Sequence, residues 1–179
     1  LAAAVQCPER VGSLVLMSSG LPGYTWTTPR PPDEVAAYAR EHGVEAAKRY
    51  WLAHPLFASL RSYPEAERAV QVMVNEFSGQ QWRGESRAAT LPNVADRIAD
   101  ISAPTLVING GRDLPGYREI GEVLAANIPG ARRVTFSESG HMVPMEQCAE
   151  VNEELLRFLE NPLSCRFAES VPATADSNR

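Results

Sequence analysis

The sequence predicts an α/β fold with a mostly parallel sheet. Two short apolar runs, at 14–17 and 105–108, and a weaker one at 133–136 are each followed by Gly, Ser or Asn residues, as strands commonly are. Continuous apolar runs indicate strands that are buried on both faces, the pattern of parallel sheets. Helical periodicity follows the second and third runs. Strands and helices that alternate with short connections indicate parallel pairing.

Each element has its own boundary signals. Residues 1–7 are typical of a helix interior, and the strand at Leu14–Met17 ends at Ser18-Ser19-Gly20. Pro104 introduces the strand at Thr105–Ile108, and Asn109-Gly110-Gly111 ends it. These turn-forming residues therefore limit both strands to a few residues.

Two helices are predicted in the α/β core, one after the second strand and one after the third. Apolar residues at helical spacing predict a helix over Tyr117–Ile128, which Pro129-Gly130 stops. After the strand at Arg133–Phe136, the same spacing recurs over 151–159 and ends at Asn161-Pro162. We therefore assign residues 1–19 and 104–160 to the α/β core.

Residues 20–103 carry helical patterns and no convincing strand. Helices are expected at 33–42, 44–53 and 64–77, and glycine or proline residues end each of them. We interpret this segment as a helical lid with a return segment, inserted between two strands of one sheet. Residues 161–179 are polar and aperiodic, and we expect a disordered tail.

Composition excludes several classes of protein. The 179 residues include 17 Lys and Arg against 22 Asp and Glu, a net charge of −5, which argues against a nucleic-acid binder and a basic membrane-surface protein. No stretch approaches the roughly 20 apolar residues of a membrane span. Cys7, Cys148 and Cys165 are odd in number and irregularly spaced, so we expect reduced thiols and a soluble, cytoplasmic protein without a metal site. Nothing in the sequence indicates the oligomeric state.

Asp113 and His141 are the candidate catalytic residues. Each closes the turn that follows its own predicted strand, so both are expected at the same edge of the sheet, where ligands bind. An aspartate that accepts the Nδ1 proton of a histidine leaves Nε2 free to accept a proton from a nucleophile. The alternative for Asp113 is an N-cap of the helix near Pro115. His42 and His54 sit at helix ends, where we interpret them as capping residues favoured by the helix dipole.

The chain resembles the C-terminal part of an α/β-hydrolase fold protein. The resemblance rests on 1–11 before the first strand, 101–113, Ile128-Pro-Gly-Ala131, Gly140-His-Met-Val-Pro-Met-Glu146 and 152–159, and it extends over nearly all of residues 1–160. It implies that Asp113 and His141 are two members of a Ser-Asp-His triad. The family often has Pro where Cys148 stands, at the start of a helix.

The resemblance also implies where the nucleophile lies. In the family it occupies a G-x-S-x-G turn, which is expected roughly seven residues before Leu1. Ser18, Ser19 and Ser139 flank the predicted site edge, but none lies in that motif. We therefore expect this chain, as a fragment without the nucleophile and the loop that completes the oxyanion hole, to be inactive alone.

Aromatic side chains of the predicted lid suggest an apolar substrate pocket. Trp51, Phe57 and Trp82, with Met142 beside the histidine, are the candidate pocket residues, although any single aromatic also suits the lid's own core. The segment Trp51–Phe57 resembles a lid segment of ester and C–C bond hydrolases.

The predicted function is hydrolysis of carboxylic esters, lactones or related small apolar substrates, without a cofactor. Two alternatives stay open. An aspartate nucleophile would make the protein a haloalkane dehalogenase or an epoxide hydrolase, and the same fold also occurs in non-catalytic proteins that bind a small ligand.

Overall fold

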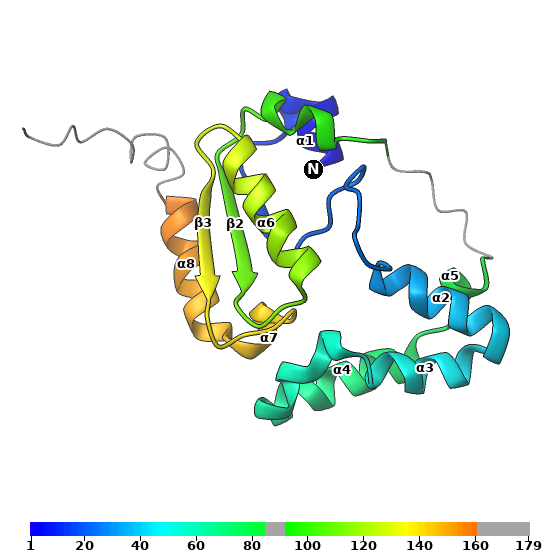
Figure 1. Cartoon of the computed structure of the whole chain (residues 1–179). Helices are drawn as coiled ribbons and strands as arrows, with labels where there is room; N and C mark the ends of the chain where they lie inside the picture. Colours follow the sequence, from blue (N-terminus) through cyan, green and yellow to red (C-terminus); the bar gives the residue numbers. More distant parts are fainter. Residues whose placement is uncertain (85–91, 161–179) are drawn as a thin grey trace, which may run out of the picture.

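Three parallel strands in the order β1-β2-β3 form the sheet of the computed structural model, which describes residues 1–84 and 92–160 (Figure 1). β1 spans Leu14–Met17, β2 spans Thr105–Gly110 and β3 spans Arg132–Phe136. Both strand pairs are parallel. The predicted α/β class and the parallel sheet are therefore confirmed.

β2 is the central strand. All six of its residues are buried, because β1 and β3 flank it and helices cover both faces. β1 differs, because only Leu16 is buried and Met17 is 37% exposed. The expectation that this strand is buried on both faces is wrong, since β2 is the only strand beside it in the described part of the chain.

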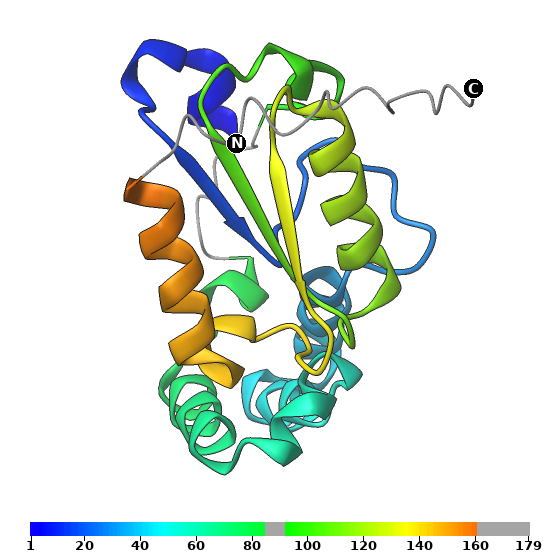
Figure 2. The same ribbon diagram turned by 90° about the vertical axis from the view of Figure 1, so that its left-hand side faces the viewer.

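Helix α6, Pro115–Asn127, covers one face of the sheet (Figures 1 and 2). Ile120 and Leu124 lie four residues apart on one helical face and pack in a cluster with Val107 of β2. The helix begins two residues earlier than the apolar spacing predicts, because proline is tolerated at the first helical position.

Helix α8, Cys148–Glu160, covers the other face (Figure 2). Its residues Val151 and Phe158 pack with Ile108, whose side chain points away from that of Val107 because successive strand residues alternate between faces. The short helix α7, Val143–Glu146, precedes α8 and contributes the buried Val143 to the same cluster.

Helices make up the regular structure between β1 and β2 in the described residues. Those between residues 31 and 83 lie beyond the carboxyl ends of the strands, as both views show (Figures 1 and 2). Gly43, with φ of 83°, ends the first of them and is the predicted C-cap. We call the following set the inserted helices: α2 (Pro31–His42), α3 (Val44–Leu52), η2 (Pro55–Ser62), α4 (Pro64–Glu76) and α5 (Gln80–Arg83).

The amino ends of the strands carry short helices: α1 (Ala2–Gln6), η1 (Pro8–Arg10) and η3 (Ala95–Asp100). Cys7 and Cys148 are exposed free cysteines, whereas Cys165 and the tail predicted at 161–179 lie outside the described residues. Across 1–84 and 92–160, the helices fall short of the length and apolar character that crossing a bilayer demands.

Two backbones approach closely at the carboxyl end of β2. A Cβ atom on Gly110 would lie 1.9 Å from the carbonyl oxygen of Gly140 and 2.5 Å from that of Ser139. Both neighbours are main-chain atoms, so they cannot rotate away as the end of a flexible side chain does. Glycine is therefore required where β2 meets the loop after β3.

We expect Gly110→Ala to lower the free energy of unfolding by about 1–3 kcal/mol, because the added methyl group forces two backbones apart. Gly12→Ala is the matched control, since a Cβ atom there meets nothing within 4 Å. Chemical denaturation of both variants measures the difference. Equal stability of the two variants would show that the close approach is not required.

Candidate active site

The loops that follow β2 and β3 are hydrogen-bonded to each other. The amide of Gly111 donates to the carbonyl of Phe136 at 2.8 Å, and the amide of Arg112 donates to the carbonyl of Ser139 at 2.8 Å. The Arg112 guanidinium also pairs with the carboxylate of Glu138. The two loops therefore leave the sheet side by side.

Asp113 and His141 end these loops and face one another. Nδ1 of His141 lies 3.0 Å from Oδ2 and 3.2 Å from Oδ1 of Asp113. The Asp113 side chain is fully buried, and that of His141 is 18% exposed. Asp113 is thus placed to accept the Nδ1 proton, which leaves Nε2 of His141 with the lone pair that a general base needs.

The Asp113 carboxylate is also held by the backbone of the next residue. Its Oδ1 accepts a hydrogen bond from the amide of Leu114 at 2.7 Å. The alternative in which Asp113 is the N-cap of α6 is wrong, because Leu114 occupies that position and the helix starts at Pro115.

An aromatic ring from α6 packs beside the imidazole, and a second ring, from the segment after β1, packs against the first. The ring centroid of Tyr117 lies 4.3 Å from that of His141, and Trp26 packs edge-on against Tyr117 at 5.1 Å. Burial, with a smaller contribution from the Asp113 carboxylate, raises the pKa of Tyr117 to about 12. The Tyr117 ring is therefore a neutral contact for the imidazole near physiological pH.

The loop that carries His141 folds around the carboxylate of Glu146, a residue that is only 6% exposed. Oε2 of Glu146 accepts the Gly140 amide at 2.6 Å, and Oε1 accepts the Met142 amide at 3.2 Å. Oε1 also accepts the hydroxyl of Ser59 in η2 at 2.9 Å. Backbone on both sides of His141 is thereby attached to one side chain.

The structure divides the four predicted pocket residues between two apolar clusters. Phe57 and Met142 belong to a cluster around Leu60, and Trp82 is buried in a second cluster. Trp51 contacts both clusters and packs edge-on against Phe57 at 5.1 Å. Met142 is thus the predicted pocket residue that joins the histidine loop to the inserted helices.

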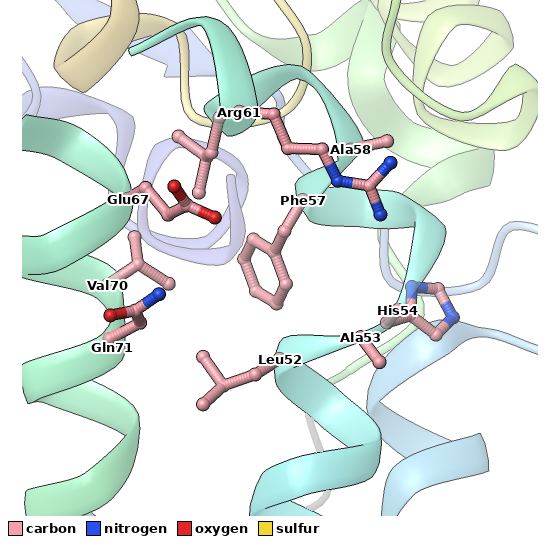
Figure 3. Close-up of a pocket in the computed structure, with 10 residues that line it drawn as sticks. Leu52, Ala53, His54, Phe57, Ala58, Arg61, Glu67, Val70 and Gln71 are labelled. Carbon is pink, nitrogen blue, oxygen red and sulfur yellow. The ribbon is translucent and has the colours of Figure 1, made fainter. Parts of the chain in front are cut away.

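Two pockets open among the inserted helices. The larger, of about 330 Å³, is lined by Pro32, Val35, Trp51, Met73, Val74, Phe77, Gln81 and Trp82. A smaller one, of about 50 Å³, lies between η2 and α4, and the Phe57 ring points into it (Figure 3). Neither set of lining residues includes Asp113 or His141.

His54 is a capping residue as predicted, and His42 lies in the last turn of α2, where the helix dipole favours a basic group. Nδ1 of His54 accepts the amide of Leu56 at 3.0 Å, so His54 caps the start of η2 as an acceptor. The cap of α2 comes from Gly43, while the His42 ring packs against Tyr38 at 4.2 Å.

Sequence reasoning missed Glu146, Ser59 and Tyr117. Glu146 did leave a signal, because it is the first acidic residue after His141 in an otherwise uncharged stretch. Ser59 left none, since its contact with Glu146 joins residues 87 positions apart.

Comparison with known proteins gives named relatives. No protein-family model matches the sequence. A 2-hydroxy-6-oxononadienedioate/2-hydroxy-6-oxononatrienedioate hydrolase from Cupriavidus pinatubonensis is 30% identical over 167 residues, which cover 90% of this chain and 58% of the relative. The hydrolase of the same description from Burkholderia vietnamiensis is 29% identical over 169 residues, covering 89% and 57%. The chain thus spans somewhat more than half the length of these relatives.

Solved structures share the fold. MenH from S. aureus superposes with a TM-score of 0.74 at 23% identity, over 89% of this chain and 63% of that one. An N-acyl homoserine lactone degrading enzyme gives a TM-score of 0.67 at 26% identity, over 87% and 61%. A parallel sheet covered on both faces, with an aspartate and a histidine after adjacent strands, is an arrangement that the α/β-hydrolase fold also has. The chain has the α/β-hydrolase fold and corresponds to the C-terminal part of that fold.

We expect the stability of the protein to fall as the pH rises from about 10 to about 12, and Tyr117→Phe to lessen that fall. An unfolded phenol ionises near its ordinary pKa of 10, whereas folded Tyr117 keeps its proton until about pH 12. The folded state therefore gains from this group below pH 10 and loses the gain as the pH rises through 12. Free energies of unfolding at both ends of this range measure the effect, and parallel curves for the two proteins would contradict it.

Proposed function

We propose that the protein is a hydrolase in which His141 is the general base and Asp113 is the carboxylate that orients it. The observation that carries this proposal is the 3.0 Å contact between His141 Nδ1 and Asp113 Oδ2. The two residues follow adjacent parallel strands, at the edge of the sheet where open α/β folds bind ligands.

The proposed reaction is acyl transfer to water through a serine that is predicted to precede Leu1. Nε2 of His141 removes the hydroxyl proton as the serine oxygen bonds to the substrate carbonyl carbon, and then returns it to the leaving alcohol as the C–O bond breaks. A water molecule repeats the sequence on the acyl-enzyme and releases the carboxylic acid and the free serine. Asp113 stabilises the imidazolium formed in each half of the reaction.

Names of the relatives support hydrolysis as the reaction class. The two relatives that are 29% and 30% identical are hydrolases, and a structural neighbour at 26% identity degrades lactones. We propose carboxylic esters, lactones or related small apolar molecules as substrates. The relatives favour a second candidate, a 2-hydroxy-6-oxo dioate like the compound in their names.

Apolar side chains between the inserted helices and the histidine loop support a small apolar substrate. We assign Trp51, Phe57, Trp82 and Met142 to its pocket. Trp51, Phe57 and Met142 pack in one cluster, and Met142 follows His141 directly. In this proposal the inserted helices form a lid over His141. We also propose that the protein acts in the cytoplasm.

We expect Asp113→Asn in the full-length protein to lower kcat on the order of 10⁴-fold, because the amide holds the wrong tautomer of His141. Asp100→Asn is the matched control, since Asp100 pairs with Arg97 on an exposed surface. Turnover of an ester, lactone and dioate panel measures the effect, alongside thermal unfolding to show that both variants are folded.

The outcomes separate the candidate functions. Undiminished turnover in the Asp113→Asn variant would contradict the proposed pair. Haloalkanes and epoxides are added to the panel, and turnover of these compounds without turnover of esters would favour an aspartate nucleophile. A folded wild-type protein that binds panel compounds and turns none over would indicate a non-catalytic ligand-binding relative.

A further inference from the structure

We propose that Glu146 is a positioning residue for His141 and that Ser59 couples the inserted helices to it. The inference rests on the proposed role of His141 as the general base. It concerns a carboxylate that does not touch the imidazole, and that acts on it through the backbone.

One carboxylate collects three donors from two parts of the fold. Oε2 of Glu146 accepts the Gly140 amide at 2.6 Å, while Oε1 accepts the Met142 amide at 3.2 Å and the Ser59 hydroxyl at 2.9 Å. The two amides belong to the residues immediately before and after His141. The carboxylate therefore fixes the main chain from which the imidazole projects toward Asp113.

Burial makes this arrangement specific. Glu146 is 6% exposed, and a carboxylate removed from water needs its hydrogen bonds, because an unsatisfied oxygen carries the full cost of desolvation. Its partners are two amides and a hydroxyl, all of them neutral. A displaced histidine loop would leave oxygens of Glu146 without donors, so the loop has one strongly preferred position.

Ser59 connects this loop to η2. Besides its hydrogen bond, Ser59 packs directly on Gly140, because a Cβ atom placed there would lie 2.1 Å from its Oγ and 2.8 Å from its Cβ. A second hydrogen bond joins the same two segments at Tyr63, four residues after Ser59. Nε2 of Gln147 donates to the Tyr63 hydroxyl at 3.0 Å. Met142 and Met145 pack with Leu60 in the same contact region.

Through these contacts, the position of η2 affects how firmly the His141 side chain is oriented. When η2 is docked, the Ser59 hydroxyl completes the set of donors to Glu146. When η2 is displaced, Oε1 keeps only the longer 3.2 Å bond from Met142. His141 is therefore held most firmly with the inserted helices in place over the site.

Two variants test the proposal in the full-length protein. Glu146→Gln replaces one acceptor oxygen with an NH₂ group that must face a donor, so we expect kcat to fall on the order of 10²-fold while KM stays within about twofold. Ser59→Ala removes one donor and leaves the two amides as the only partners of a less firmly held carboxylate, so we expect a smaller fall in kcat, of about tenfold. Glu150→Gln and Ser62→Ala are the matched controls, because both residues are exposed and lie on α8 and η2.

A spectroscopic readout distinguishes positioning from general stability. The chain has three histidines, so ¹⁵N imidazole spectra can resolve His141. We expect one Nδ1-protonated tautomer in the wild type and a mixture of tautomers in Glu146→Gln. Amide hydrogen exchange at Gly140 and Met142 should quicken in both test variants and in neither control.

Each result decides the proposal separately from the proposed function. Wild-type kcat, a single His141 tautomer and unchanged exchange at Gly140 in both variants would overturn it, even if Asp113→Asn is inactive. If Asp113→Asn stays active, the proposed function fails, and the tautomer and exchange measurements alone decide whether Glu146 positions the ring. If Glu146→Gln does not fold, Ser59→Ala carries the test.

Discussion

Hydrogen bonds between the loops after β2 and β3 are the constraint on which the site depends. The amides of Gly111 and Arg112 donate to carbonyls of the loop that leads to His141, and Gly110 allows the two backbones to touch. Parallel pairing alone brings two loops to one edge of a sheet. The additional bonds convert that proximity into a contact of 3.0 Å between side chains 28 positions apart, Asp113 and His141.

Two buried carboxylates contact different parts of the histidine loop. Asp113 faces the imidazole and is held by the amide of Leu114, whereas Glu146 faces the main chain on both sides of the ring. Both need their donors because burial removes most of their contact with water. Ring and backbone are therefore oriented by separate groups, and Tyr117 supports the ring by contact without adding charge.

Local patterns predicted most of the sheet, because short apolar runs and their turn residues are encoded next to one another. Asp113 and His141 were predictable for the same reason, since each follows its own strand. The exposure of Met17 was not, because burial depends on which strands lie beside β1. The contact of Ser59 with Glu146 depends on how η2 docks, and no periodicity in either segment encodes it. Apolar character alone also could not show that Trp82 and Phe57, which are both predicted pocket residues, lie in different apolar clusters.

The inserted helices leave the sheet from β1 and return to it at β2, and these two strands are hydrogen-bonded neighbours. A segment that exits and re-enters at adjacent positions can be exchanged between relatives as a module without changing the order of the strands. Its contacts at Glu146 and Gln147, however, fall on chain that comes after β3. If Ser59 couples the inserted helices to the proposed base, a chimera with new helices needs a hydroxyl for Glu146 as well. A change in the helices and the preserved orientation of His141 would then be selected together.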